Sequence, residues 1–267
     1  MDNKIETNFT DIHGNHFLIE LPKPSLIESF FVFSLVKAGS TLINNIVKEI
    51  CDHNRISTIS IYDQAFIQGI RTRNVPSAVK RIILDRGYGY LGFRHYFPFN
   101  DPPDLSRNKK ILLVRDPRDI LVSLYFSNYF SHVVPKEGEA RQAFIRLRTE
   151  SITSIDSFVL QKAESLLSEY KVYLQQIAQP LWKIYKYEDI IYQKRTWVED
   201  LAQYLDLEMN DDLLRNILRN YDIFPAVEDQ NSHIRQVHPG NFKKHLKHET
   251  ISNLDYKFHD ILKSFFT

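Results

Sequence analysis

One stretch of the chain, residues 30–46 (FFVFSLVKAGSTLINNI), constrains the fold more than any other. Its first half, 30–36, is an almost unbroken apolar run, which is typical of a buried parallel strand. After the small or cationic residues of KAGST, 37–41, apolar residues recur at helical spacing over 42–50. A strand, a tight glycine loop and a helix aim backbone N–H groups and a helix N-terminus at an anion.

This loop predicts a phosphate site but does not decide it alone. Lys37 would add a point charge, and the hydroxyls of Ser40 and Thr41 would add donors. The competing interpretation is an ordinary turn with a solvated lysine, because Gly, Ser and Thr are common in turns. The segment also differs from the Walker motif, in which a second glycine directly precedes the lysine.

Strands alternating with helices along the rest of the chain predict an α/β fold with a mostly parallel central sheet and helices on both faces. We expect one domain over residues 1–267, with residues 1–29 as an irregular or edge-hairpin lead-in and 131–150 as a charged surface excursion or flap. The expected strands are 30–36, 81–84, 88–96, 111–114 and 181–187. The expected helices are 42–50, 62–70, 117–125, 154–178, 196–205, 211–221 and 251–265.

Composition narrows the function classes. The 34 basic residues balance 33 acidic ones, which gives no reason to expect nucleic-acid binding. Cys51 is the one cysteine, so no intrachain disulfide can form, and a reducing compartment fits. No apolar run approaches the roughly 20 residues that span a bilayer, and the polar start is unlike a secretory signal. We therefore expect a cytoplasmic protein without a membrane span.

A second segment, 111–125 (ILLVRDPRDILVSLY), repeats the logic of the first loop. Arg115 follows a buried strand at its carboxyl end, where ligands bind in open α/β sheets, and its planar fork suits a phosphate. Ser123 lies on the following helix, within reach of the same anion. The competing interpretation is a structural ion pair of Arg115 with Asp116 or Asp119, with Ser123 in the core.

A third segment, 233–246 (HIRQVHPGNFKKHL), is basic and contains Gly240. Such a loop, with Arg235, Lys243 and Lys244, can close over a dianion. A solvated run of charges is the competing interpretation.

Taken together, these segments resemble the sulfotransferases that use 3′-phosphoadenosine-5′-phosphosulfate (PAPS). KAGST is similar to their 5′-phosphosulfate loop, and VRDPRDILVSLY to their 3′-phosphate-binding strand and helix. Tyr187, with Glu188 and Asp189, resembles the tyrosine-acid pair near the adenine, and RQVHPGNFKKHL has the spacing of the late phosphate loop. The matches follow the family's order over about residues 30–246.

The resemblance implies a P-loop NTPase-like fold, PAPS as donor, adenosine 3′,5′-bisphosphate (PAP) as product, a small-molecule hydroxyl acceptor and no metal. Lys37 would bind the 5′-phosphosulfate and stabilise charge on the leaving phosphate. Arg115, Ser123 and Arg235 would hold the 3′-phosphate, and Gly240 would allow the late loop to turn. The donor-binding set is Lys37, Ala38, Gly39, Ser40, Thr41, Leu42, Arg115, Ser123, Tyr187, Phe224, Arg235, Gln236 and Gly240.

The same resemblance makes His95, in GFRHYFPF, the candidate general base, because the family often has a histidine in a Lys-X-His-X-Pro setting there. A neutral imidazole suits removal of a hydroxyl proton near pH 7. The competing interpretation is a histidine packed among aromatic side chains. The predicted acceptor-binding residues are Phe93, Arg94, Tyr96 and Phe97.

The sequence also departs from the family pattern. Phe93 stands where many relatives have a catalytic lysine, and Leu42 replaces an aromatic residue that often stacks on adenine, for which Phe224 is a candidate source. Gln236 and Val237 replace a Lys and a Gly, and valine does not readily adopt positive φ. A sulfotransferase-like binding protein without activity therefore stays open as an alternative. A small-molecule P-loop kinase is a second alternative, because the loop at residues 37–41 also suits a nucleotide phosphate. The acceptor's identity and a homodimer are also left open.

Overall fold

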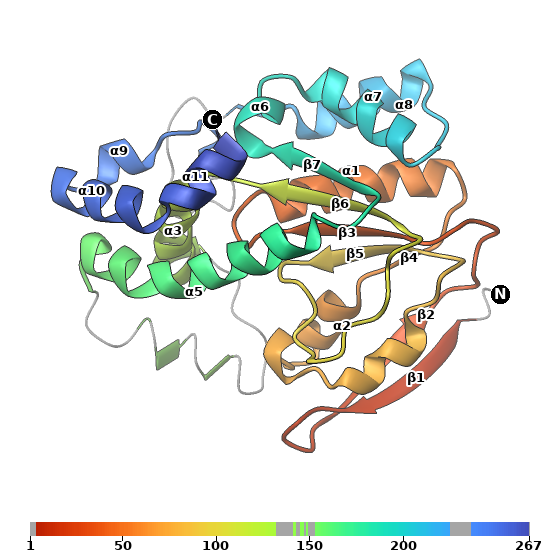
Figure 1. Ribbon diagram of the computed structural model, residues 1–267. Coiled ribbons are helices and arrows are strands. Elements are labelled where there is room, and N and C mark those ends of the chain that lie inside the picture. Colours follow the sequence, from red (N-terminus) through yellow and green to blue (C-terminus); the bar gives the residue numbers. More distant parts are fainter. Residues whose placement is uncertain are drawn as a thin grey trace.

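The fold is built on a five-stranded parallel sheet with strand order β4-β5-β3-β6-β7 (Figure 1). The computed structural model describes residues 4–131, 141–142, 145–146, 148, 153–224 and 236–266. In sheet order, the strands are Thr58–Ile59 (β4), Gly89–Phe93 (β5), Phe30–Ser34 (β3), Lys109–Val114 (β6) and Trp182–Lys186 (β7). Every neighbouring pair is parallel, which confirms the predicted α/β class.

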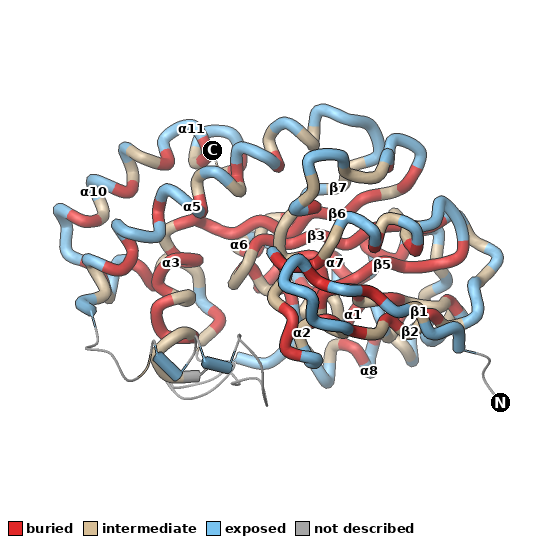
Figure 2. The backbone as a smooth tube through the Cα atoms, turned by 90° about the horizontal axis from the view of Figure 1, so that it is seen from below, coloured by how far each residue is buried: buried red, intermediate tan, exposed pale blue. Residues whose placement is uncertain are grey.

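Helices cover both faces of this sheet because successive side chains of its buried strands point to opposite sides. Phe30 and Val32 of β3 pack into one core, and Phe31 and Phe33 pack into the other. The first core holds α1 (Ser40–His53), α7 (Lys194–Tyr204) and α8 (Asp211–Tyr221). The second holds α2 (Ile61–Ile67), α3 (Pro117–Phe126), α5 (Ile155–Gln176), α10 (His248–Lys257) and α11 (His259–Phe266). Figure 2 shows the strands as a buried layer within this arrangement.

The N-terminal lead-in, expected to be irregular or an edge hairpin, is an antiparallel hairpin of β1 (Ile5–Thr10) and β2 (His16–Leu21) that forms its own two-stranded sheet. Helix α2 covers the edge of β2. The amide of Leu18 donates to Gln68 Oε1 at 2.9 Å, and the amide of Glu20 donates to Gln64 Oε1 at 2.8 Å. Glutamine side chains thus satisfy backbone groups that a neighbouring strand would otherwise pair.

Two helices begin with a side-chain cap. Asp116 accepts the amide of Arg118 at 2.9 Å at the start of α3. Asn210 accepts the amide of Leu213 at 2.8 Å at the start of α8. Each cap satisfies a donor that the first turn of a helix leaves without a backbone acceptor.

The structure corrects two expected elements. Residues 81–84 are not a strand, because a 3₁₀ helix, η2 (Ser77–Ile82), buries Val79 and Ile82 at the i, i+3 spacing of that helix. The expected C-terminal helix over 251–265 is two helices, α10 and α11, which meet at the buried Phe258. The expected flap over 131–150 lies largely outside the described residues.

The remaining short elements are η1 (Thr72–Asn74), η3 (Ser127–Ser131), α6 (Tyr187–Ile190) and α9 (Phe242–His245). None of the helices in the described ranges combines the length and the apolar character that a bilayer crossing needs.

One edge of the sheet gathers the segments singled out from the sequence. Because the strands are parallel, β5, β3, β6 and β7 all end at this edge. The segments that follow them contain His95, Lys37, Arg115 and Tyr187, respectively. Adjacent strands are about 4.8 Å apart, so these residues start from neighbouring positions in that order.

Candidate active site

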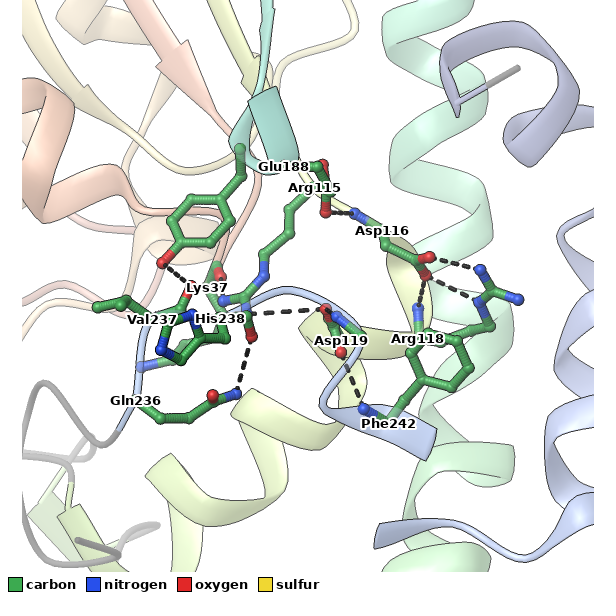
Figure 3. A network of polar contacts seen from close by, with 12 residues as sticks. Lys37, Arg115, Asp116, Arg118, Asp119, Glu188, Gln236, Val237, His238 and Phe242 are labelled. Carbon is green, nitrogen blue, oxygen red and sulfur yellow. Dashed lines mark hydrogen bonds and ion pairs between the residues drawn. The ribbon is translucent and has the colours of Figure 1, made fainter. Parts of the chain in front are cut away.

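Lys37 and Arg115 lie side by side although 78 residues separate them in the chain. Beyond β3, the amide of Leu35 still donates to the carbonyl of Leu113 at 3.2 Å, which carries the pairing with β6 toward the strand ends. Arg115 Nη1 then donates to the Lys37 carbonyl at 3.3 Å. Figure 3 shows the two residues within one polar network. The neighbourhood on which a shared nucleotide site depends is therefore present.

The loop after β3 has an unusual backbone. Lys37 adopts φ +60° and Gly39 adopts φ +100°, both in the left-handed region. A Cβ at position 39 would lie 3.1 Å from the Tyr187 ring and 3.3 Å from Leu113, so only glycine fits without strain. Gly39 is also the N-cap of α1 and has no side chain to cap it. The first N–H groups of a 14-residue helix therefore start at this loop, a geometry that favours an anion.

The other residues of KAGST differ in burial. Ala38 and Ser40 are buried, and Thr41 is exposed. Leu42 is partly buried and packs against the core that contains α1. The loop therefore combines a fixed inner part with an outer hydroxyl that faces solvent.

Arg115 is held on several sides. Its guanidinium lies 4.3 Å from the centroid of the Tyr187 ring, and its side chain is 7% exposed. Asp119 Oδ2 is 3.9 Å from Nη2, so the competing ion pair exists at long range. Asp116 instead bonds Arg118, whose Nε donates to its Oδ1 at 2.9 Å. Within the described residues, the buried Nε of Arg115 has no hydrogen-bond partner, which leaves one donor for a ligand.

Tyr187 joins the loop after β3 to the loop around Gly240. Its ring lies against Gly39, and its hydroxyl donates to the carbonyl of Val237 at 2.9 Å (Figure 3). Burial raises the pKa of Tyr187, which keeps the hydroxyl protonated as a donor. The next residue, Glu188, accepts the amide of Asp116 at 2.8 Å, and burial raises its pKa as well. The end of β7 is thus tied to the end of β6.

The late loop is fastened by Asp119 of α3. This buried carboxylate accepts the amides of Gly240 at 2.7 Å and Phe242 at 2.9 Å (Figure 3). Burial raises the pKa of Asp119. Gly240 adopts φ +80°, a turn that glycine permits.

The start of the late loop differs in sequence from the family pattern, but Val237 there has no backbone strain from a positive φ. Val237 is buried and is not among the described residues with positive φ. Gln236 Nε2 donates to the carbonyl of His238 at 3.1 Å. Arg235 lies outside the described residues. Ser123 is half-buried on α3, about two helical turns beyond Arg115.

An aromatic group that the sequence did not suggest surrounds Phe224. The rings of Phe224 and Tyr192 are nearly parallel, at 12° and 6.2 Å between centroids. Tyr192 Oη lies 3.0 Å from His238 Nδ1, and Lys194 Nζ lies 4.2 Å from the Phe224 centroid. Asp222 accepts a hydrogen bond from this lysine at 2.8 Å. The rings come from three separate segments, so no local pattern could have revealed them.

His95 follows β5 and has a carboxylate partner. Its Nδ1 lies 3.1 Å from Glu169 Oε1 of α5, and the imidazole is 37% exposed. No sequence pattern indicated Glu169, because its position on an amphipathic helix is compatible with a solvent-facing residue. The histidine is therefore not simply enclosed by aromatic rings.

The predicted acceptor residues occupy different environments. Phe93 is 1% exposed and packs in the aromatic core with Phe33, and Phe97 is buried against both. Tyr96 is half-buried and lies against Phe33 as well. Arg94 Nη1 bonds Asp63 Oδ1 at 2.5 Å. The structure thus places the two phenylalanines in the core behind His95 and Arg94 in an ion pair.

The described residues contain no cluster of three or more His, Cys, Asp or Glu side chains arranged to hold a metal ion. The cationic character of the site comes from Lys37, Arg115 and the helix N-terminus. Such a set of groups binds and orients an anion with several charges.

Comparison with known proteins shows the class of enzyme to which this chain belongs. The family model described as "Sulfotransferase domain" matches residues 28–266. The chain therefore belongs to the sulfotransferase family and is an enzyme of that class. No curated protein sequence matches it significantly.

Solved structures show the same fold at low sequence identity. Mouse sulfotransferase SULT7A1, complexed with PAP, is 12% identical with a TM-score of 0.62, and the match covers 91% of this chain and 86% of that one. Retinol dehydratase in complex with androsterone and inactive cofactor PAP is 13% identical with a TM-score of 0.51, covering 98% and 91% of the two chains. Its complex with retinol and PAP is 13% identical with a TM-score of 0.50, covering 98% and 92%.

Proposed function

We propose that this sulfotransferase takes its sulfuryl group from PAPS and transfers it to a hydroxyl group of a small-molecule acceptor, releasing PAP. The observation that carries the proposal is the meeting of Lys37, Gly39, Arg115 and Tyr187 at one sheet edge. The solved relatives named above contain PAP, which supports the same donor here.

Two features of the site fit a bound nucleotide. The buried Nε of Arg115 lacks a partner within the described residues, and an anionic oxygen would supply one. Gly39 gives the loop a tight turn against the Tyr187 ring that a Cβ would not allow. This turn leads into the first backbone N–H groups of α1, which would face a phosphate.

The residues divide along the edge. Lys37, Ala38, Gly39, Ser40 and Thr41 would hold the 5′-phosphosulfate. Arg115 and Ser123, with Arg235 from outside the described residues, would hold the 3′-phosphate. Gln236 and Gly240 would position the late loop over it. Leu42, Tyr187 and Phe224 would contact the adenine.

When bound, PAPS supplies an activated sulfuryl group. His95 accepts the proton of the acceptor hydroxyl, whose oxygen forms a bond to sulfur as the bridging bond from sulfur to the phosphate oxygen breaks. Lys37 and the α1 N-terminus stabilise the charge that this phosphate gains. Preorganised electrostatic groups of this kind often contribute the largest share of catalysis. Phe93, Arg94, Tyr96 and Phe97 shape the region where the acceptor lies.

Calorimetry with PAP, followed by mass spectrometry of PAPS reactions with a panel of phenols, sterols, alkanols and sugars, tests the proposal. We expect PAP binding and at least one product heavier by a sulfuryl group. Lys37→Ala should lower activity at least about a hundredfold, the scale of losing one electrostatic group. Lys48→Ala is the matched control, because Lys48 is an exposed lysine on α1 paired with Asp52. A protein that binds neither PAP nor PAPS would refute the proposal.

The alternatives lead to other outcomes. PAP binding without transfer to any acceptor would favour an inactive binding protein, and Phe93 in place of a lysine is the observation behind that alternative. Magnesium-dependent ATP turnover would favour a kinase. A cytoplasmic location and a homodimer stay predictions.

A further inference from the structure

The contact between His95 and Glu169 is unusual for a partly exposed ion pair. Glu169 Oε1 lies 3.1 Å from His95 Nδ1, and the glutamate side chain is 24% exposed. Its second oxygen, Oε2, is buried and has no hydrogen-bond partner among the described residues. An isolated surface pair contributes little to stability. Stability alone therefore does not explain why one oxygen of this carboxylate is buried without a partner while the other contacts an imidazole.

Two tyrosines of α5 close to Glu169 fix the position of this part of the helix. The hydroxyl of the next residue, Tyr170, donates to the carbonyl of Arg115. One turn on, the ring of Tyr173 packs against Tyr96, the neighbour of His95, at 6.2 Å between centroids. Two adjacent residues of α5 thus contact the ends of two strands: Tyr170 bonds the backbone of Arg115 after β6, and Glu169 contacts His95 after β5. The helix therefore fixes the distance between Arg115 and His95.

The other titratable groups around the pair are either neutral near neutral pH or directed to other residues. Burial raises the pKa values of Tyr62 from α2, Tyr96 from the His95 loop and Tyr173 from α5, so all three stay neutral. Arg94 is occupied by its ion pair with Asp63. The charge of Asp104 acts on Tyr96, whose pKa it raises further. Among the groups that these contacts identify, Glu169 is the charge that touches the imidazole.

We infer that Glu169 is a positioning residue for His95, an inference that rests on the proposed role of His95 as general base. The carboxylate accepts the Nδ1–H proton and so selects the tautomer whose lone pair is on Nε2. During transfer, the proton of the acceptor hydroxyl moves to Nε2 while Nδ1–H stays bonded to Glu169. The same carboxylate then stabilises the imidazolium. This is the logic of a base oriented by a third group.

NMR of the full-length ¹⁵N-histidine-labelled protein tests the tautomer without an acceptor. His95→Gln assigns the His95 signals. We expect the wild type to show a protonated Nδ1 and an unprotonated Nε2 above neutral pH. In Glu169→Gln, the amide can donate to Nδ1, so the Nε2–H tautomer should gain population. Glu164→Gln, an exposed glutamate on the same helix paired with Lys257, is the control and should leave the wild-type pattern. An Nε2–H tautomer in the wild type, or identical spectra in Glu169→Gln, would overturn the inference.

Kinetics with two phenols of different acidity separate positioning of the base from a purely structural role, which would lower kcat equally for both phenols. Loss of the oriented base should lower kcat for 2-naphthol by about 10- to 100-fold, below the full range for general base catalysis because the pair is partly solvated. The effect should be much smaller for 4-nitrophenol, which already ionises near neutral pH. Glu169→Asp should recover part of the loss, and PAP affinity should not change. Equal losses for both phenols would contradict positioning of the base.

The two proposals fail separately. Absence of PAP binding by the wild type would refute the donor assignment and leave the NMR result to decide the tautomer. Normal PAP binding and transfer, with kcat unchanged in Glu169→Gln, would refute the positioning role alone.

Discussion

The two ends of the candidate site are built differently. At the ends of β3, β6 and β7, the side chains and the backbone are interlocked: Arg115 contacts the Lys37 carbonyl and the Tyr187 ring, and Tyr187 holds Val237. At the end of β5, His95 is partly exposed and touches one carboxylate, that of Glu169. We call these the donor half and the acceptor half.

The difference follows from what each half is proposed to bind. A donor with fixed charges is best met by groups that need no rearrangement, because reorganisation would lower their electrostatic effect. A hydroxyl acceptor needs one correctly placed base and a surface that fits its carbon skeleton. We therefore expect substitutions in the donor half to alter nucleotide affinity and stability, and substitutions in the acceptor half to alter turnover.

His95→Gln is the sharpest test of this division. Loss of the general base should lower kcat by about 10²- to 10⁴-fold. PAP affinity by calorimetry should stay unchanged, because the imidazole lies in the acceptor half. His16→Gln, an exposed histidine bonded to Thr10 on the N-terminal hairpin, is the control. A His95→Gln protein with normal turnover would remove the base assignment, and one with weakened PAP binding would break the division into halves.

Arg115→Ala should affect the donor half most. Removal of the buried guanidinium would delete a proposed phosphate ligand and leave Asp119 without its nearby positive charge, so activity should fall at least about a hundredfold. PAP affinity measured by calorimetry should fall with it. Arg86→Ala, an exposed arginine paired with Glu28, should leave both unchanged. Unaltered PAP affinity in Arg115→Ala would exclude this residue as a phosphate ligand.

The sequence predicted the donor half better than the acceptor half, for a physical reason. Lys37 and Arg115 each follow an apolar run, and parallel strands end at one edge, so a local pattern predicts a distant neighbour. No such rule predicts the neighbours of Glu169, Tyr192 and His238, because the sequence of a helix face or a loop does not show which residues pack against it. The roles of the predicted site residues remain proposals.

Local patterns also failed where a short apolar run suited two structures. Residues 81–84 (RIIL) contain a short apolar run compatible with a strand, yet Val79 and Ile82 are buried together by a 3₁₀ helix. Phe93 shows a related limit: its place in the motif did not indicate that its ring packs in the aromatic core, and its contact with an acceptor stays a prediction. Burial is decided by tertiary contacts that periodicity does not contain.

Gly39→Ala tests whether the donor half depends on backbone shape. The new Cβ would meet Tyr187 at 3.1 Å while φ stays at +100°, so we expect the free energy of unfolding to fall by about 1–3 kcal/mol and PAP affinity to weaken. Gly14→Ala separates the two causes, because Gly14 has φ +87° but nothing within 4 Å of its added Cβ. It should show the backbone strain alone, with normal PAP binding, in denaturant titration and calorimetry. Equal losses in both variants would mean that the approach of Gly39 to Tyr187 is unimportant.

Tyr187→Phe should produce the smallest effect. It keeps the ring under Arg115 and removes the hydroxyl that donates to the Val237 carbonyl at 2.9 Å. Loss of one buried hydrogen bond should lower the free energy of unfolding by about 1 kcal/mol. PAP affinity should also fall severalfold, because the late loop loses its anchor to β7. Tyr204→Phe is the matched control, since its hydroxyl donates to the Leu181 carbonyl at 2.6 Å. Leu181 directly precedes β7, so this bond lies at the other end of the strand from Tyr187. Similar destabilisation in both variants, with weaker PAP binding in Tyr187→Phe alone, would show that interlocking in the donor half serves the nucleotide as well as the fold. Equal PAP affinity in the two variants would show that it serves only the fold.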